Sequence, residues 1–281
     1  MKTETDRSVA SPEPDEGSGK RRNPVLRFLG EMPGLIIMSL ILAILIKTFL
    51  IQAFYIPSQS MEDTLRVNDR VLVSKVPYYF HDPQRGDVIV FSEPDPAKQP
   101  QRSFIGGIAH WIFEGIGVQK PDNPDFIKRV IGVPGDTVVY KDKHLTVNGV
   151  PWPQKPEGTY SYLEGLRFET MNQFEETVDT GRGPKAHLAA VDPAMASVSP
   201  GQVRAFPARE NCEYNPDGSE FTCKVPPGNY FVMGDNRDRS DDGRYWGFVP
   251  DDHLRGRAFF VWFNWDDISG FMFKRVGSGI R

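Results

Sequence analysis

An unbroken apolar stretch near the start of the chain limits what the whole protein can be. Residues 34–56 read GLIIMSLILAILIKTFLIQAFYI, and Lys47 is the only charged residue among these 23. As a helix, a stretch of this length extends roughly 35 Å, enough to cross a hydrocarbon layer of about 30 Å. A helix buried in a soluble core, the first alternative, usually keeps a polar stripe. The stretch therefore predicts one transmembrane helix.

A cleaved secretory signal is the second alternative, because a basic segment also precedes the apolar core of such a signal. The run here is longer than a typical signal core, and no small-x-small cleavage site follows it directly. A cluster of four basic residues lies shortly before it, namely Lys20, Arg21, Arg22 and Arg27. Because positively charged flanks stay in the cytoplasm, we expect a single-pass protein of the cell membrane, with everything after Ile56 extracytoplasmic.

The segment before the helix, residues 1–23, is polar and rich in Pro, Ser, Gly and charge. Such a composition offers too little apolar surface to offset the entropy of folding. We expect a disordered cytoplasmic tail there.

Beyond residue 56, short segments rich in β-branched and aromatic residues alternate with turn signals. They read RVLVSKV, DVIVF, FIKRVIGV, DTVVYKD, HLTVNG, NYFVMG and RAFFVWF. This pattern predicts a mainly β domain with antiparallel sheets. Residues 151–227 have weaker periodicity and more Pro, Glu, Gly and Ser, which indicates a smaller inserted β subdomain. We therefore expect a core in two parts, 57–150 and 228–273, and a C-terminal tail at 274–281.

Two further segments have two interpretations each. Residues 103–119, SFIGGIAHWIFEGIGVQ, are apolar but too short to span a membrane. They are either an ordinary packed helix or a segment that dips into the membrane surface. The aromatic residues of 259–265, with Phe271 and Phe273, are either β-core residues or part of an interfacial belt.

The two cysteines, Cys212 and Cys223, flank NPDG, a turn signal that could pair two short strands. A disulfide is consistent with an extracytoplasmic location. A pair of free buried thiols stays open, since the sequence does not show that the two Cα atoms lie within bridging distance.

Several kinds of site are not indicated by the sequence. The formal net charge of −4 gives no general reason to expect nucleic-acid binding, and no H-E-x-x-H, G-x-x-x-x-G-K-[ST] or G-x-S-x-G motif occurs. The five histidines, His81, His110, His144, His187 and His253, are scattered, so each is expected to be a surface or packing residue. We expect neither a histidine triad nor a metal or other cofactor.

A pair of serines stands directly after the apolar stretch, in YIPSQSMEDTL. Pro57 ends the predicted helix, and Ser58 and Ser60 follow it. Taken alone, these serines would be caps or turn residues, which are common after a helix end.

Five blocks after the apolar stretch change that interpretation. They are, in order, PSQSM, NDRVLVSK, RGDVIVF, FIKRVIGVPGD and GDNRDRSDDGRYWGFVP. This ordered set resembles the blocks of the bacterial type I signal peptidases, and agreement of all five by chance is negligible. The resemblance covers the end of the anchor and most of the core, and it leaves the tail and the inserted region uncovered.

The resemblance implies a role for each matching residue. It makes Ser60 the nucleophile and Lys128 its general base, while Ser58 and the backbone amide of Ser60 form the oxyanion hole. Ser240 would hold the lysine amine, and Asp242 and Arg244 would form a supporting ion pair. The neighbouring residues Gly234, Asp235, Asn236 and Arg237 would be scaffold.

A lysine base is chemically reasonable here. A neutral amine can accept the serine proton if burial lowers the lysine pKa from about 10.4 by several units, and FIKRVIGV supplies apolar neighbours. On a strand, Lys128 and Arg129 point to opposite faces, so we expect a buried base beside an exposed arginine. The alternative for Lys128 is an ordinary exposed strand lysine.

The sequence departs from the family pattern at four positions without removing a catalytic group. Gln59 stands where glycine is frequent, Asp63 replaces a common proline, Asn68 stands where glycine is usual, and Arg239 replaces a common asparagine. These changes bear on the conformation of the serine loop and on the charge near Ser240.

The resemblance implies removal of signal peptides from exported preproteins, with small side chains at the first and third positions before the cut. Shallow apolar pockets would suit them, lined by residues near Ile56, Met61, Val71 and Ile127, and the substrate would bind as an added strand. A sortase-like transpeptidase is disfavoured because the chain has no plausible Cys and His pair. An inactive membrane-tethered scaffold is disfavoured because Ser60 and Lys128 are both present.

Overall fold

The computed structural model describes residues 24–94, 125–164, 166–264 and 275–280. The chain divides into two compact units, one ending at Ala43 and the other beginning at Ile44. The predicted tail at 1–23 and the apolar segment at 103–119 lie outside the described residues, as do Phe271 and Phe273.

Helix α1 runs from Pro24 to Phe49, and the prediction of a helix through Ile56 was wrong at its C-terminal end. Residues Ile51–Tyr55 form strand β1 instead, which pairs antiparallel with β2, Asp69–Ser74. The side chains of β1 alternate between exposed and half-buried, the period of a strand, and the β2 ladder satisfies its backbone groups. Within the described residues, no helix has the length and hydropathy that crossing a membrane requires.

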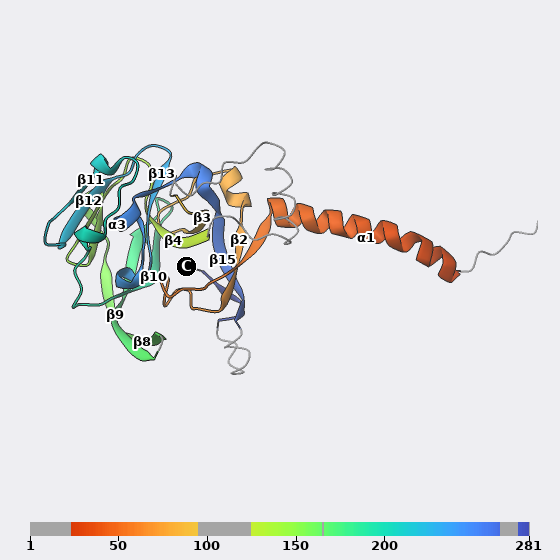
Figure 1. The fold of residues 1–281 in the computed structure, drawn as a ribbon, viewed down its shortest axis with the longest axis horizontal. Helices are drawn as coiled ribbons and strands as arrows, with labels where there is room; N and C mark the ends of the chain where they lie inside the picture. The colour runs from red at the N-terminus through yellow and green to blue at the C-terminus, as the bar shows by residue number, and fades with distance from the viewer. Residues whose placement is uncertain (1–23, 95–124, 165, 265–274, 281) are drawn as a thin grey trace, which may run out of the picture. The chain divides into compact units, whose positions relative to one another are not determined.

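The largest sheet has eight strands, and all its pairs are antiparallel, as predicted. Its order is β1-β2-β15-β3-β4-β13-β14, with β16 paired to β15 (Figure 1). The bounds of the further strands are β3 Val88–Ser92, β4 Asp125–Gly132, β13 Asn229–Met233, β14 Phe248–Pro250, β15 Leu254–Asn264 and β16 Ser278–Gly279. Strand β4 therefore lies inside the sheet, between β3 and β13.

Two smaller antiparallel sheets follow. One has the order β11-β12-β5-β6-β7, with β5 Thr137–Lys141, β6 His144–Val147, β7 Val150–Pro151, β11 Cys212–Tyr214 and β12 Glu220–Lys224. The other has the order β10-β9-β8, with β8 Gln154–Glu164, β9 Arg167–Asp179 and β10 Pro184–Val191. Strand β12 pairs with β5, so residues before Pro151 and residues after Cys212 share the five-stranded sheet.

The remaining elements are short. They are helix α3, Gly243–Trp246, and the 3₁₀ helices η1 Val76–Tyr79, η3 Pro200–Gln202, η4 Arg209–Asn211, η5 Arg237–Arg239 and η6 Asp251–His253. Of these, η5 and α3 lie in the block GDNRDRSDDGRYWGFVP that the sequence singles out.

The disulfide between Cys212 and Cys223 is present, which confirms that interpretation over free thiols. The two cysteines are directly opposite in the β11–β12 pair, with their Cα atoms 4.1 Å apart. Both belong to a buried apolar cluster that also contains Tyr140 and Phe221. The bridge thus closes a hairpin in the core of the five-stranded sheet.

The segment expected to be a C-terminal tail is packed where the structure describes it. Strand β16 pairs with β15, and Ile280 packs against a buried apolar cluster of the large sheet. Arg275 forms an ion pair of 2.5 Å with the buried Asp69 and donates a hydrogen bond to the carbonyl of Thr64. The end of the chain therefore braces the connection between β1 and β2.

Candidate active site

Ser60 lies in the loop that connects β1 to β2, and its side chain is almost buried. Two backbone hydrogen bonds close the base of this loop, from the Ile56 amide to Asp69 (2.9 Å) and from the Asn68 amide to Ile56 (3.0 Å). Asn68 has φ +74°, a left-handed conformation that asparagine tolerates better than most residues. Asparagine therefore fits where the family usually has glycine.

Lys128 lies on β4, and its amine reaches the serine loop. Its Nζ donates a hydrogen bond of 2.6 Å to the Ser60 hydroxyl, and the lysine side chain is buried. The fold thus brings together two residues that are 68 positions apart in the sequence. The geometry matches a nucleophile paired with its base.

Burial lowers the pKa of Lys128 to about 8, against the opposing influence of Asp242, Asp241 and Asp235. An ammonium is destabilised when it loses water without gaining a paired carboxylate. Lys128 donates to a neutral hydroxyl, so its charged form receives little compensation. With this pKa, roughly a tenth of the amine is neutral at pH 7, against fewer than about one in a thousand for an ordinary lysine, and the neutral form is the one that a base requires.

The segment after β13 holds the backbone of the serine in place. The Asn236 amide donates to the Ser60 carbonyl at 3.2 Å, and the Asn236 side chain donates to the Gln59 carbonyl. A Cβ on Gly234 would lie 2.3 Å from both the Ser60 carbonyl oxygen and the Ser240 hydroxyl oxygen. Only glycine therefore fits at position 234, and Ser240 is a close neighbour of the nucleophile.

Asp242 and Arg244 form a fully buried ion pair of 2.9 Å. The Asp242 carboxylate also accepts hydrogen bonds from the amides of Gly234 and Arg244, so it caps helix α3. Arg244 donates to the carbonyls of Ser197 and Arg237. The pair thus ties the Gly234 segment to α3.

The structure does not show the expected bond between Ser240 and the lysine amine. The Ser240 hydroxyl is buried and makes no hydrogen bond with any described residue, and Asp242 lies near it without hydrogen-bond geometry. Ser58 is on the exposed side of the loop, with its hydroxyl 3.4 Å from that of Ser60.

Comparison with known proteins identifies the family. The family model for signal peptidase, peptidase S26, matches residues 29–265. The chain belongs to the signal peptidase S26 family.

Two curated relatives have similarity over most of their length. Signal peptidase I of Aquifex aeolicus is 36% identical over 238 residues, which cover 80% of this chain and 81% of the relative. Signal peptidase I of Haemophilus influenzae is 32% identical over 265 residues, covering 84% and 72% respectively. A solved signal peptidase I of Enterococcus faecalis is 24% identical and covers 63% of this chain and 97% of its own, with a TM-score of 0.28.

The four residues expected near the substrate side chains of this signal peptidase are all buried in one apolar cluster. They are Ile56, Met61, Val71 and Ile127. Met61 directly follows the serine and Ile127 directly precedes the lysine, so the cluster adjoins both.

Arg129 is buried, which contradicts the expectation of an exposed arginine beside the base. Its guanidinium donates two hydrogen bonds to Asp235, of 2.8 and 2.7 Å, and a third to the Gly86 carbonyl. The two neighbours do alternate in direction, but β4 is buried along both faces from Ile127 onward. The alternation of side chains along β4 does not show which residues cover the face that carries Arg129.

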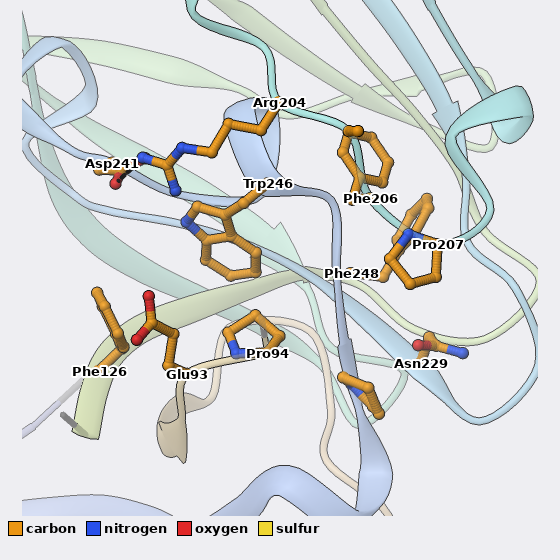
Figure 2. A pocket seen from close by; sticks show the side chains of 12 residues that line it. Glu93, Pro94, Phe126, Arg204, Phe206, Pro207, Asn229, Asp241, Trp246 and Phe248 are labelled. Atoms are coloured by element: carbon orange, nitrogen blue, oxygen red, sulfur yellow. Dashed lines mark hydrogen bonds and ion pairs between the residues drawn. The ribbon is translucent and has the colours of Figure 1, made fainter. Parts of the chain in front are cut away.

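Two cavities are lined in part by residues of the block GDNRDRSDDGRYWGFVP. Figure 2 shows an aromatic pocket in which the Trp246 ring lies between the Arg204–Asp241 pair and the side chains of Glu93 and Pro94. Neither Ser60 nor Lys128 is among its lining residues. A second, more polar cavity includes Ser240 in its wall, so it reaches the edge of the catalytic site.

Proposed function

We propose that this signal peptidase cleaves signal peptides from exported preproteins with Ser60 as nucleophile and Lys128 as general base. The observation that carries the proposal is the 2.6 Å contact between the Lys128 amine and the Ser60 hydroxyl in a buried setting. The chain also belongs to the signal peptidase family.

The reaction then has two stages. Neutral Lys128 accepts the Ser60 proton as the Ser60 oxygen attacks the scissile carbonyl, and the resulting ammonium gives that proton to the departing amine. Water then attacks the ester and loses a proton to Lys128, and the ammonium returns that proton to the Ser60 oxygen as the bond to the acyl carbon breaks and the signal peptide leaves as a carboxylic acid. The Ser60 amide and the Ser58 hydroxyl would donate to the oxyanion in both stages.

The supporting residues act on geometry. The Asp242–Arg244 pair would fix the Gly234 segment, and that segment holds the Ser60 backbone. Ser240 has a buried hydroxyl close to Ser60 that makes no hydrogen bond with a described residue, so it would be free to accept one from the lysine amine during the reaction.

Substrate would bind as an added strand beside the site, with backbone hydrogen bonds for affinity. The apolar cluster of Ile56, Met61, Val71 and Ile127 would select small apolar side chains, because all four residues are buried and packed together beside Ser60 and Lys128.

The anchor and the topology belong to the same proposal. Eight apolar side chains of α1 are between 42% and 67% exposed, from Leu35 to Ile46, which is the condition of a helix that faces lipid. With Lys20, Arg21 and Arg22 directly before α1 and Arg27 in its first residues, the domain beyond β1 would be extracytoplasmic and residues 1–23 cytoplasmic. The two-part core, 57–150 and 228–273, around an insertion at 151–227 is likewise proposed.

The test is cleavage of one labelled preprotein by purified wild type and by Ser60→Ala, with the cut mapped by mass spectrometry. The variant lacks only the nucleophilic oxygen, so we expect a wild-type fold and no processing. Substantial turnover by Ser60→Ala would refute the serine mechanism. Protease added to intact spheroplasts should digest the domain and spare the tail, and the reverse pattern would refute the topology.

A further inference from the structure

A histidine is buried behind β4, on the face opposite the lysine base. His187 of β10 has a side chain that is 1% exposed. Its Nε2 lies 3.4 Å from the Glu176 carboxylate and 3.8 Å from that of Asp235. Neither ring nitrogen makes a hydrogen bond with a described residue. Burying a polar ring without hydrogen bonds destabilises the folded state, so such a ring calls for an explanation.

The histidine belongs to a buried charge cluster, which we define as His187 with Arg129, Asp235, Arg237 and Glu176. Arg129 pairs with Asp235 at 2.7 Å and Arg237 pairs with Glu176 at 2.5 Å, and all four side chains are at most 1% exposed. Two cations thus face two carboxylates. The cluster is electrically balanced when the ring of His187 is neutral.

A proton on His187 would add a third cation to this set. The imidazolium would compete with the arginines for carboxylates that are already paired, with no water to compensate. Burial lowers the pKa of His187, as does Arg129 on β4, while Glu176 on β9 and Asp235 after β13 oppose them. Burial alone would raise the pKa of Glu176 and of Asp235, but Arg237 and Arg129 respectively hold them below their usual values.

Asp235 connects this cluster to both partners of the dyad. It accepts a 2.6 Å hydrogen bond from Thr64, which lies in the serine loop four residues after Ser60. It is paired with Arg129, the neighbour of Lys128. The Asp235 carbonyl also accepts from the Ala190 amide of β10, the strand that carries the histidine.

We propose that His187 is a positioning residue of the dyad. Its neutral ring leaves Asp235 bound to Arg129 and Thr64, whereas protonation of the ring draws Asp235 away from them and inactivates the enzyme. This inference rests on the proposed roles of Ser60 and Lys128. It predicts that activity requires the loss of two protons, one from Lys128 and one from His187.

The experiment is the pH dependence of kcat/KM for the full chain in detergent micelles with a fluorogenic signal-peptide substrate. For the wild type, log kcat/KM should fall with slope 1 below pH about 8, from Lys128. The slope should steepen towards 2 at some pH below about 6.5, the ordinary pKa of histidine. His187→Gln cannot be protonated there and should keep slope 1. His253→Gln, whose ring contacts Ser92 outside the cluster, is the matched control and should steepen like the wild type.

The outcomes are separable. A wild-type slope of 1 at every pH at which circular dichroism shows the enzyme to be folded would overturn the inference, and this result needs no variant. Steepening that persists in His187→Gln would also overturn it, and would point to another buried acid such as Glu62, whose pKa burial raises. Failure of the first break near pH 8 would instead count against the proposed dyad. If His187→Gln does not fold, His187→Asn takes its place.

Discussion

Lys128 and Arg129 are neighbours on one strand, both buried, and their surroundings give them opposite properties. Lys128 donates to a neutral hydroxyl, whereas Arg129 donates two hydrogen bonds to a carboxylate. The first cation loses its hydration with little in return, and its pKa falls to about 8. The second is paired and stays charged, because a guanidinium does not lose its proton in proteins. Burial therefore favours a neutral amine on one face of β4 and accompanies a buried ion pair on the other.

The largest expected effect comes from making position 128 resemble position 129. Lys128→Arg keeps the positive charge but supplies no lone pair, so we expect preprotein cleavage to fall by at least about 10³-fold. Lys128→Ala should lose as much, and both variants should still bind signal peptide. Initial cleavage rates and a fluorescence binding assay measure the two quantities. Near-wild-type cleavage by Lys128→Arg would show that the residue supplies charge rather than base catalysis.

Arg129→Met tests the contribution of the ion pair on the other face of β4 to stability. It leaves Asp235 as a buried carboxylate without its cation, so we expect the free energy of unfolding to fall by about 3–5 kcal/mol. Urea unfolding of the purified chain at pH 7 measures this change. A loss under 1 kcal/mol would mean that the pair is dispensable, and the contrast between the two faces would fail.

Lys128→Met carries the same substitution one residue earlier and should have the opposite sign. The folded-state pKa of about 8 lies below the unfolded value, so the unfolded chain binds more protons between about pH 8 and 10.5. The wild type is therefore penalised fully below pH 8, and its stability rises with pH across that window. At pH 6.5 the variant should be more stable by about 2–3 kcal/mol, an advantage that disappears near pH 10.5. Equal stability of both proteins at pH 6.5 would contradict this.

The sequence alone paired Ser60 with Lys128, and the structure brings these two side chains into contact, but the sequence did not predict what surrounds them. Ser60 and Lys128 stand in ordered blocks, and the turn between Cys212 and Cys223 correctly indicated the disulfide. The burial of Arg129 was missed because its partners, Asp235 and the Gly86 carbonyl, come from other parts of the chain, and the alternation of β4 does not show that they cover its second face.

The C-terminal end of α1 was also beyond what the local sequence could predict. The composition of residues 51–55 is apolar enough for a membrane helix, and only the pairing with β2 reveals a strand. Pairing partners lie far along the chain, so local patterns do not specify them. The antiparallel β class, by contrast, follows from the alternation within each segment and was predicted correctly.

The most direct test of the account is the upper part of the pH profile of kcat/KM for the wild type, which reports ionisations of the free enzyme. Lys128 must be neutral to act, so activity should be full above its pKa and decline as the pH falls through it. We predict a single ionisation close to pH 8, because burial lowers the pKa of Lys128 to about 8. An activity that rises without a break until about pH 10.5, the range of an ordinary lysine, would contradict the claim that burial makes Lys128 the base.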